Sequence, residues 1–390
     1  MYDTDDSAYR VECVDNYERL LRLRDAWLLL QQEICGLPVF LTWEWISEWW
    51  RHFGGTHQLW VLVVSEPNGT LAGIAPWMRT VQPLSQMRVL RVQFIGSGTV
   101  CPSGLCLLAR AGAQEAVTSS CITYLQHHRD CWDVLDLEGL ATEALDRLSP
   151  WLQPMHTVER PPLVCPYIEL PSDWEVFLTA IDKKLRRNLR YFPSLLEREH
   201  PGASSYHVLL QQSEIPAAFD SLVAMHQARR EDSTLGSLDF VNFHRGIAAK
   251  AMANNWLRFY QLLVEDCPIS ALYCFRFQET VYAYQIGFDV EWARYSPGRL
   301  VSAHAIEASI REGARRFEWL QGDHAYKFEW TDKARQDHHV LAASSVRGDL
   351  WLAAMHLRDQ GIEEIKRQIP PATLHKLERR LARPSAPTQN

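Results

Sequence analysis

Hydrophobic and polar residues change their spacing several times along the chain, and the changes follow the same order in its two halves. In the first half, short apolar runs typical of strands alternate with stretches that carry the helical period. The predicted order is strand 9–14, helices 16–33 and 42–53, strands 59–64, 71–78 and 89–95, helix 113–127 and strand 132–137. Pro67-Asn68-Gly69 is a strong turn signal between two of these runs and predicts a hairpin there.

The second half repeats this order with negligible sequence identity to the first. Its predicted elements are strand 206–210, helices 215–229 and 240–254, strands 257–264, 269–277 and 281–288, helix 297–312 and strand 317–320. The shared order is a strand, two helices, three antiparallel strands, a helix and a final strand. We therefore predict an α+β fold with two tandem halves, each a mixed, mostly antiparallel sheet flanked by helices.

The boundaries between the parts follow from composition. Residues 150–171 carry six prolines and are predicted to be a linker, which divides the chain into domains 1–165 and 166–347. An extra helix is predicted at 174–199, and its basic residues are Lys183, Lys184, Arg186, Arg187 and Arg190. Residues 348–390 are predicted to be a helical tail, basic and amphipathic from Arg358 onwards. A solvated face is the plainer interpretation of the basic helix, and an anion-binding surface is the functional one.

Charge and composition exclude several classes of protein. The net charge of −7 belongs entirely to residues 1–165, so no basic field for DNA is expected. The N-terminus is too acidic for a signal peptide, and no apolar run is long enough for a transmembrane segment. The nine cysteines show neither a disulfide framework nor metal-ligand spacing, so a cytoplasmic protein without a metal site is expected. Trp is unusually frequent, and the cluster at 43–50 predicts packing between the halves.

The start of the predicted helix at 297 has the chemistry of a phosphate site. Ser296 suits an N-cap and Pro297 the first helical position, while Gly298 leaves the next turn without a side chain. Arg294 and Arg299 flank these residues. Helix amides, the positive end of the helix dipole and two guanidinium groups together favour an anion. The alternative is an ordinary, well-capped helix.

A second group of reactive residues follows the last predicted strand. Only seven of the forty basic residues are Lys, and Lys327 stands in this segment, Gly322-Asp323-His324-Ala325-Tyr326-Lys327. A carboxylate, a phenol and an ammonium at the end of a strand favour a ligand site. The alternative is a helical ion pair between Asp323 and Lys327, which are four residues apart.

These two groups of residues resemble the acetyltransferase domain of the CelD/BcsL family, in the GNAT superfamily, whose members are often encoded with exopolysaccharide biosynthesis proteins. The resemblance covers about 170–335 and rests on short motifs in the right order. They are Lys184-Leu185-Arg186-Arg187-Asn188-Leu189-Arg190, Phe243-His244-Arg245, Tyr282-Ala283-Tyr284-Gln285-Ile286-Gly287-Phe288-Asp289, Tyr295-Ser296-Pro297-Gly298 and Gly322-Asp323 with Tyr326-Lys327. The first half resembles the family's N-terminal region more loosely, through Thr42-Trp43-Glu44-Trp45 and Trp132-Asp133-Val134-Leu135-Asp136-Leu137. It departs from the family at Cys101-Pro102-Ser103-Gly104, where many members have an Asp-Tyr pair. The sequence therefore does not decide whether the first half contributes to the acceptor pocket.

The resemblance implies two GNAT-like halves arranged as in the Fem-type aminoacyltransferases, with acetyl-CoA or another acyl-CoA as co-substrate. It implies Asp323 or His226 as the base and Tyr326 or Tyr284 as the acid. Lys327, with Arg187, would hold an anionic acceptor. The other implied contacts are Arg294, Ser296, Gly298, Arg299 and Gln285 for the cofactor and Asp289 for the substrate.

The function expected from this resemblance is acyl-CoA-dependent N-acyl transfer, most simply acetylation of an amino sugar or a related precursor of exopolysaccharide or cell-envelope polymers. Two alternatives stay open: a catalytically silent GNAT-like module that binds a partner in such a system, and a Fem-like, aminoacyl-tRNA-dependent transferase. The basic helix is the feature that supports the last of these. Nothing in the sequence defines an oligomeric state.

Overall fold

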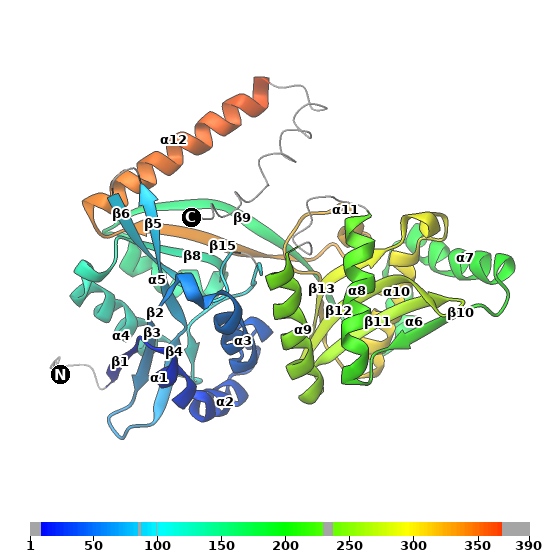
Figure 1. The fold of residues 1–390 in the computed structure, drawn as a ribbon, viewed down its shortest axis with the longest axis horizontal. Coiled ribbons are helices and arrows are strands. Elements are labelled where there is room, and N and C mark those ends of the chain that lie inside the picture. The colour runs from blue at the N-terminus through cyan, green and yellow to red at the C-terminus, as the bar shows by residue number, and fades with distance from the viewer. Residues whose placement is uncertain (1–8, 85–86, 99, 229–236, 369–390) are drawn as a thin grey trace.

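The two halves of the chain lie side by side in the computed structural model (Figure 1), which describes residues 9–84, 87–98, 100–228 and 237–368. The order of elements predicted for the C-terminal half is confirmed, and so is that of the N-terminal half, except that two of its predicted strands are each divided in two and a further short strand precedes the helix at 114–127. Among the described residues, no helix combines the length and apolarity needed to cross a membrane.

The N-terminal half contains the elements that end with the long strand β9. They are β1 (Arg10–Val14), α1 (Tyr17–Arg22), α2 (Arg24–Glu33), α3 (Trp43–Phe53), β2 (Gln58–Leu59), β3 (Val61–Ser65), β4 (Leu71–Ala75), β5 (Trp77–Leu84), β6 (Met87–Phe94), β7 (Leu108–Ala109), α4 (Gln114–His127), β8 (Val134–Ala141), α5 (Thr142–Leu152) and β9 (His156–Glu169). The run predicted as one strand at 71–78 is two strands, β4 and β5. They separate at Pro76 and belong to different sheets.

The C-terminal half follows with its own helices and strands. They are α6 (Trp174–Ala180), α7 (Lys183–Glu199), β10 (Ser204–Val208), α8 (Ile215–Gln227), α9 (Leu238–Ala253), β11 (Leu257–Val264), β12 (Cys267–Phe277), β13 (Thr280–Phe288), the 3-10 helix η6 (Val290–Tyr295), α10 (Pro297–Arg311), β14 (Arg316–Glu318), α11 (Ala325–Phe328), β15 (Ala334–Ala343) and α12 (Val346–Gln368). The predicted basic helix is two helices, α6 and α7, because Asp182 caps a second helix start with its carboxylate.

One large sheet joins the halves. Its strand order is β10-β11-β12-β13-β14-β9-β15-β8-β6-β5-β2, and β1-β3-β4-β7 form a second, smaller sheet. The strands β9 and β15 run from one half into the other (Figure 1). Each follows one half in sequence and pairs with the other: β9 with β14, and β15 with β8. Each half is therefore completed by a strand from the other.

The predicted linker at 150–171 is wrong, because most of it is the central strand β9. Its prolines indicated a break in regular structure. In the folded chain Pro161 and Pro162 lie where the register between β9 and β15 shifts, between the pairs Leu163–Asp337 and Arg160–His339. A bulged ladder tolerates residues that have no N–H to donate, so the strand continues through them.

Helices α3 and α9 form the main helical contact between the halves. Gly246 of α9 faces Glu48 of α3, and a Cβ there would clash with Glu48 Oε1, so a larger residue would force the Glu48 side chain to move. The buried Glu48 carboxylate binds the Lys250 ammonium of α9 at 2.9 Å. Trp45 packs on Phe243 and Phe275, with ring centroids 5.1 and 5.6 Å away. The prediction that the Trp cluster packs between the halves is therefore confirmed for Trp45, whereas Trp43 and Trp49 contact rings of the N-terminal half.

Candidate active site

A cleft opens where strands β13 and β14 separate. Their parallel pairing covers three residue pairs and ends at Tyr282 and Glu318. Directly afterwards β13 has a bulge, because Tyr273 and Cys274 of β12 face Gln285 and Ala283 and leave Tyr284 as the extra residue. A bulge bends its strand, and β14 is only three residues long, so the two strands diverge.

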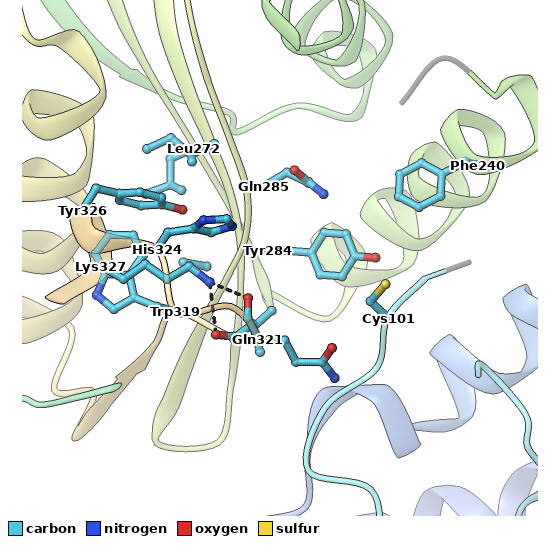
Figure 2. A pocket seen from close by; sticks show the side chains of 13 residues that line it. Cys101, Phe240, Leu272, Tyr284, Gln285, Trp319, Gln321, His324, Tyr326 and Lys327 are labelled. Carbon is cyan, nitrogen blue, oxygen red and sulfur yellow. Dashed lines mark hydrogen bonds between the residues drawn. The ribbon is translucent and has the colours of Figure 1, made fainter. Parts of the chain in front are cut away.

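A cavity of about 230 Å³ lies in this cleft (Figure 2). Most of its wall comes from β13 on one side and from the segment between β14 and the end of α11 on the other. The lining residues are Cys101, Phe240, Leu272, Ala283, Tyr284, Gln285, Ile286, Trp319, Leu320, Gln321, His324, Tyr326 and Lys327. The set contains no Asp or Glu. Four of the predicted site residues, Tyr284, Gln285, Tyr326 and Lys327, therefore meet at one cavity.

Lys327 is a buried ammonium in the wall of this cavity. The residue is only 4% exposed, and its Nζ donates to the carbonyl oxygens of Leu320 and Gln321 at 3.2 and 2.5 Å. Burial lowers its pKa to about 8, and Cys165 and Asp323 oppose the shift electrostatically. The alternative of a helical ion pair is wrong, because α11 begins only at Ala325, beyond Asp323.

The backbone before α11 is folded tightly around this ammonium. Leu320 has a φ of +57° and Gly322 a φ of +113°, both in the left-handed region. A Cβ at Gly322 would lie 3.3 Å from Lys327 Nζ, so a side chain there would crowd the ammonium as well as strain the turn. Left-handed backbone at a non-glycine residue is costly and clusters at functional sites.

The N-terminal half supplies part of the wall, a point that the sequence left open. Cys101 lines the cavity and lies beside the hydroxyl end of Tyr284, across the site from Tyr326 (Figure 2). The Tyr284 hydroxyl donates to the carbonyl oxygen of Val100 at 2.7 Å, and burial raises the pKa of this phenol. Gln321 binds the carbonyl oxygen of Pro102 at 2.8 Å.

A buried ionic network holds this N-terminal segment against the sheet. Asp337 of β15 is fully buried, binds the Arg335 guanidinium and Ser103 Oγ, and accepts the Gly104 amide at 3.1 Å. Arg335 also donates to the buried Glu318 carboxylate at 3.1 Å. The network joins β14 and β15 to the segment that contains Cys101.

The start of α10 differs from its prediction. Ser296 occupies the predicted N-cap position and Pro297 begins the helix, but Ser296 is left-handed, with a φ of +54°, and its hydroxyl does not make the predicted capping hydrogen bond. Its Oγ instead accepts from Arg299 at 2.7 Å, and Arg299 forms two hydrogen bonds with Glu329. Arg294 pairs with Glu199 at 2.8 Å. Both predicted phosphate-binding guanidinium groups thus have carboxylate partners.

Gly298 places the α10 start next to the cavity. A Cβ on Gly298 would lie 3.8 Å from the Cδ1 atom of Ile286, a lining residue. The first amides of a helix have no partner within the helix and favour anions. Pro297 has no N–H, and the Arg299 and Leu300 amides donate to the Ser296 carbonyl at 2.9 and 3.3 Å. The helix start therefore offers an anion the Gly298 amide and the positive end of the helix dipole.

The other predicted residues lie outside the lining. His226, on α8, packs against the backbone of Gly287, where a Cβ would be 3.4 Å from the His226 ring. Asp289 caps η6 by accepting the Glu291 amide at 3.0 Å. Arg187 is exposed on α7, and Asp323 is exposed beside Lys327. No group of three or more His, Cys, Asp or Glu in the described parts of the chain is arranged to hold a metal ion.

Sequence reasoning missed several lining residues. His324 and Gln321 belong to the segment that includes Asp323 and Lys327, so the signal that found their neighbours could have found them. The His324 ring stacks on Tyr326, with ring centroids 6.0 Å apart. Cys101 and Phe240 come from distant parts of the chain, and no local pattern indicates their role.

Comparisons with known proteins agree with this geometry. Residues 183–328 match the acetyltransferase (GNAT) domain family. The fold is similar to that of FemX, with a TM-score of 0.57 and 8% identity, over 84% of this chain and 96% of FemX. It is also similar to the C-terminal domain of a putative lysylphosphatidylglycerol synthetase from Agrobacterium fabrum, with a TM-score of 0.50 and 12% identity, over 87% and 95% of the two chains. No curated protein sequence matches the chain.

At these identities the solved structures establish the fold, and the domain match establishes the class of enzyme. The chain has a tandem GNAT fold, and the matched domain contains the cleft between β13 and β14. The chain therefore contains an acyltransferase domain of the GNAT type, over residues 183–328.

Proposed function

We propose that the protein transfers an acyl group, most simply acetyl, from acyl-CoA to the amine of an amino sugar or a related precursor of exopolysaccharide or cell-envelope polymers. The observation that supports acyl transfer is the cavity between the separating strands β13 and β14. Beside it, near the start of helix α10, lies Gly298, a residue without a side chain. The acceptor class and the link to exopolysaccharide rest on the resemblance of the residue motifs to the CelD/BcsL family.

The donor is proposed to lie along β13, with its pyrophosphate at the amides that begin α10. Arg299 and Arg294 already bind carboxylates, so the Gly298 amide and the helix dipole are the proposed attraction for phosphate. The acyl thioester would then reach the cavity near Gln285. This places the reacting carbonyl between β13 and Lys327.

The chemistry requires a base and an acid. A neutral acceptor amine attacks the thioester carbon, the amine loses a proton, and CoA leaves as a thiolate that takes up a proton. His324, in the cavity wall, and Asp323, beside it, are the proposed base candidates, whereas His226 packs behind Gly287. Tyr326 is favoured over Tyr284 as the acid, because the Tyr284 hydroxyl is held by the Val100 carbonyl.

Lys327 is proposed to attract the negative charge of the acceptor or of the developing oxyanion. With a pKa of about 8, it is mostly protonated at neutral pH. Two of its three N–H groups bind backbone carbonyls, and the third can serve a ligand in the cavity. A buried, fixed ammonium stabilises negative charge more strongly than an exposed one.

A Fem-like, aminoacyl-tRNA-dependent reaction is the second candidate, and one observation favours it. The first two turns of helix α7 expose four basic side chains: Lys183, Lys184, Arg187 and Arg190. Such a surface attracts a polyanion.

Thermal shift separates these functions. A donor at 100 times its Kd raises the free energy of unfolding by about 2.7 kcal/mol. Acetyl-CoA, longer acyl-CoAs and an aminoacyl-tRNA are compared on the full chain, and we expect the shift with an acyl-CoA. Gly298→Val should weaken that binding by about tenfold or more, since its side chain would crowd Ile286 and Phe288. Gly55→Val, which meets open space, is the control.

The absence of a shift with every acyl-CoA would contradict the proposal. A response to aminoacyl-tRNA alone would then favour the Fem-like reaction. No response to either donor would favour a catalytically silent binding module.

A further inference from the structure

A group of buried polar rings lies directly behind the cavity wall. His244 of α9 is 1% exposed, and neither of its ring nitrogens has a hydrogen-bond partner among the residues that the structure describes. Its ring lies 4.3 Å from that of Phe240 and 4.6 Å from that of Tyr284, measured between centroids. Both of these rings line the cavity, so His244 is one side chain removed from it.

Two further rings beside His244 have unpaired polar atoms. Tyr273 of β12 and Trp45 of α3 are fully buried, with ring centroids 5.7 and 6.0 Å from that of His244. Within the described parts of the chain, the Tyr273 hydroxyl and the Trp45 Nε1–H also have no hydrogen-bond partner. Leaving a buried polar group unpaired destabilises the folded protein, because the group loses its bonds to water and gains none. Four such atoms in one cluster are not explained by stability.

The chemistry of this cluster selects its ligand. The indole N–H donates a hydrogen bond, and the phenol hydroxyl donates or accepts. A neutral imidazole donates at one ring nitrogen and accepts at the other. Burial keeps the imidazole and the phenol uncharged, lowering the pKa of His244 and raising that of Tyr273. The Glu48 carboxylate and the Lys250 ammonium, which form an ion pair between α3 and α9, neutralise each other's charge. Such a site fits neutral groups that both donate and accept, which are hydroxyl groups.

We propose that His244, Tyr273 and Trp45 form an inner subsite of the cavity that binds hydroxyl groups of a sugar ring. This inference rests on the proposed function and makes the acceptor a polyhydroxylated ring. The rings of Phe240 and Tyr284 offer the flat apolar surfaces on which such a ring stacks. For the hydroxyl groups to reach His244, the Phe240 ring, which lines the cavity and lies 4.3 Å from the His244 ring, would have to shift.

Two probes of the same ring size test the subsite. D-glucosamine and cyclohexylamine each present an amine on a six-membered ring, but only the sugar carries hydroxyl groups. Binding of each to the full chain is measured by calorimetry with the acetyl-CoA site occupied by free CoA. We expect glucosamine to bind at least about tenfold more tightly than cyclohexylamine.

Variants locate the selectivity. His244→Phe, which fills the space without polar atoms, should remove most of the tenfold preference, and Tyr273→Phe should reduce it about threefold. Tyr260→Phe removes another buried phenol, in the core on the opposite face of the sheet, and should keep the preference. Because Tyr273→Phe deletes a single atom, it tests the subsite even if His244→Phe does not fold.

Equal binding of the two probes to the wild type would overturn the subsite, and so would full selectivity in both ring variants. Acetyl-CoA binding is measured separately on each protein. Its absence in the wild type contradicts the proposed function, while the ratio of the two probes, measured then without CoA, still reports on the subsite.

Discussion

The two halves share one order of elements but differ at the cleft. In the C-terminal half, β13 and β14 separate and leave a cavity between them. In the N-terminal half, β6 and β8 pair at only two positions, and the chain itself occupies the space beyond. Leu105 forms a parallel bridge to Leu140, donating to the Gly139 carbonyl at 2.7 Å and accepting the Ala141 amide at 2.9 Å.

The helix beside each cleft differs in the same way. Helix α10 begins with Pro297 and Gly298, whereas α4 begins after Ala113 with Gln114. Cys106 and Leu107, which follow the bridging residue, line a remaining N-terminal cavity of about 170 Å³. The N-terminal half has therefore filled its cleft with its own backbone, and its contribution to the active cleft is a wall that contains Cys101.

The largest expected effect is on the free energy of unfolding, when the ionic network that connects this wall to the C-terminal half is disrupted. The Arg335 guanidinium is paired with two buried carboxylates, those of Asp337 and Glu318. Asp337→Ala removes one of these two partners. Removing one partner of a buried pair costs about 3–5 kcal/mol. Denaturant unfolding of the full chain should show this loss.

The matched control is Asp349→Ala, which removes an exposed partner of His156 and should change the free energy of unfolding by less than about 1 kcal/mol. Equal stability of the two variants would show that the network does not hold the halves together.

Lys327→Ala tests whether the chemistry belongs to the C-terminal cleft. Loss of the buried ammonium should lower turnover at least about tenfold while the protein stays folded, since a fixed charge next to the reacting groups is lost. Steady-state kinetics and thermal unfolding measure the two properties. Arg147→Ala, in the wall of the N-terminal cavity, should leave turnover within about twofold, and a larger loss there would reverse the assignment of the halves.

Asp323→Ala sharpens the same assignment. The carboxylate is exposed beside Lys327, so its removal affects the stability little, and we expect turnover to fall about tenfold through loss of a base or of charge balance. Asp332→Ala, another exposed carboxylate after α11, is the control for surface charge. Unchanged turnover in both Lys327→Ala and Asp323→Ala would contradict the assignment of the active site to this cleft.

The sequence predicts the C-terminal half well because its strands are continuous apolar runs and its helices have regular spacing. It fails at β9, where Pro161 and Pro162 indicate a linker but occupy a register shift. It also fails at β15, where the buried Asp337 and two histidines interrupt any strand pattern. Both strands are stabilised by partners in the other half, which no local window contains.

The prediction of the site succeeded where a short segment contains the residues and failed where the residues depend on distant parts of the chain. Tyr326 and Lys327 could be found because they follow a strand within one short segment, and Tyr284 and Gln285 through the motif that holds them. Cys101 reaches the cavity through pairing between the halves. Ser296 and Asp289 were assigned to ligands, yet each makes a local hydrogen bond within the protein. Ser and Asp side chains serve both local capping and ligand binding, so the sequence alone does not distinguish the two roles, whereas the geometry does.

The smallest effect concerns the proton on Lys327. Its pKa is about 8 in the folded protein and close to the ordinary value of 10.5 once the chain unfolds. Between these values the unfolded state binds more protons, so this group makes the free energy of unfolding rise with pH, by at most about 1.4 kcal/mol per pH unit. Below pH 8 both states are protonated and the cost of burial is fully present.

Lys327→Met removes the titration, so wild type should gain stability relative to this variant from pH 8 to 10. Turnover of the wild type should change in the opposite direction and fall as pH rises through about 8, because the ammonium is the form that attracts negative charge. Paired pH series of denaturant unfolding and of turnover measure both. If turnover instead rises with the same midpoint, the neutral amine of Lys327 is the active form, and its role changes from charge stabilisation to that of a base.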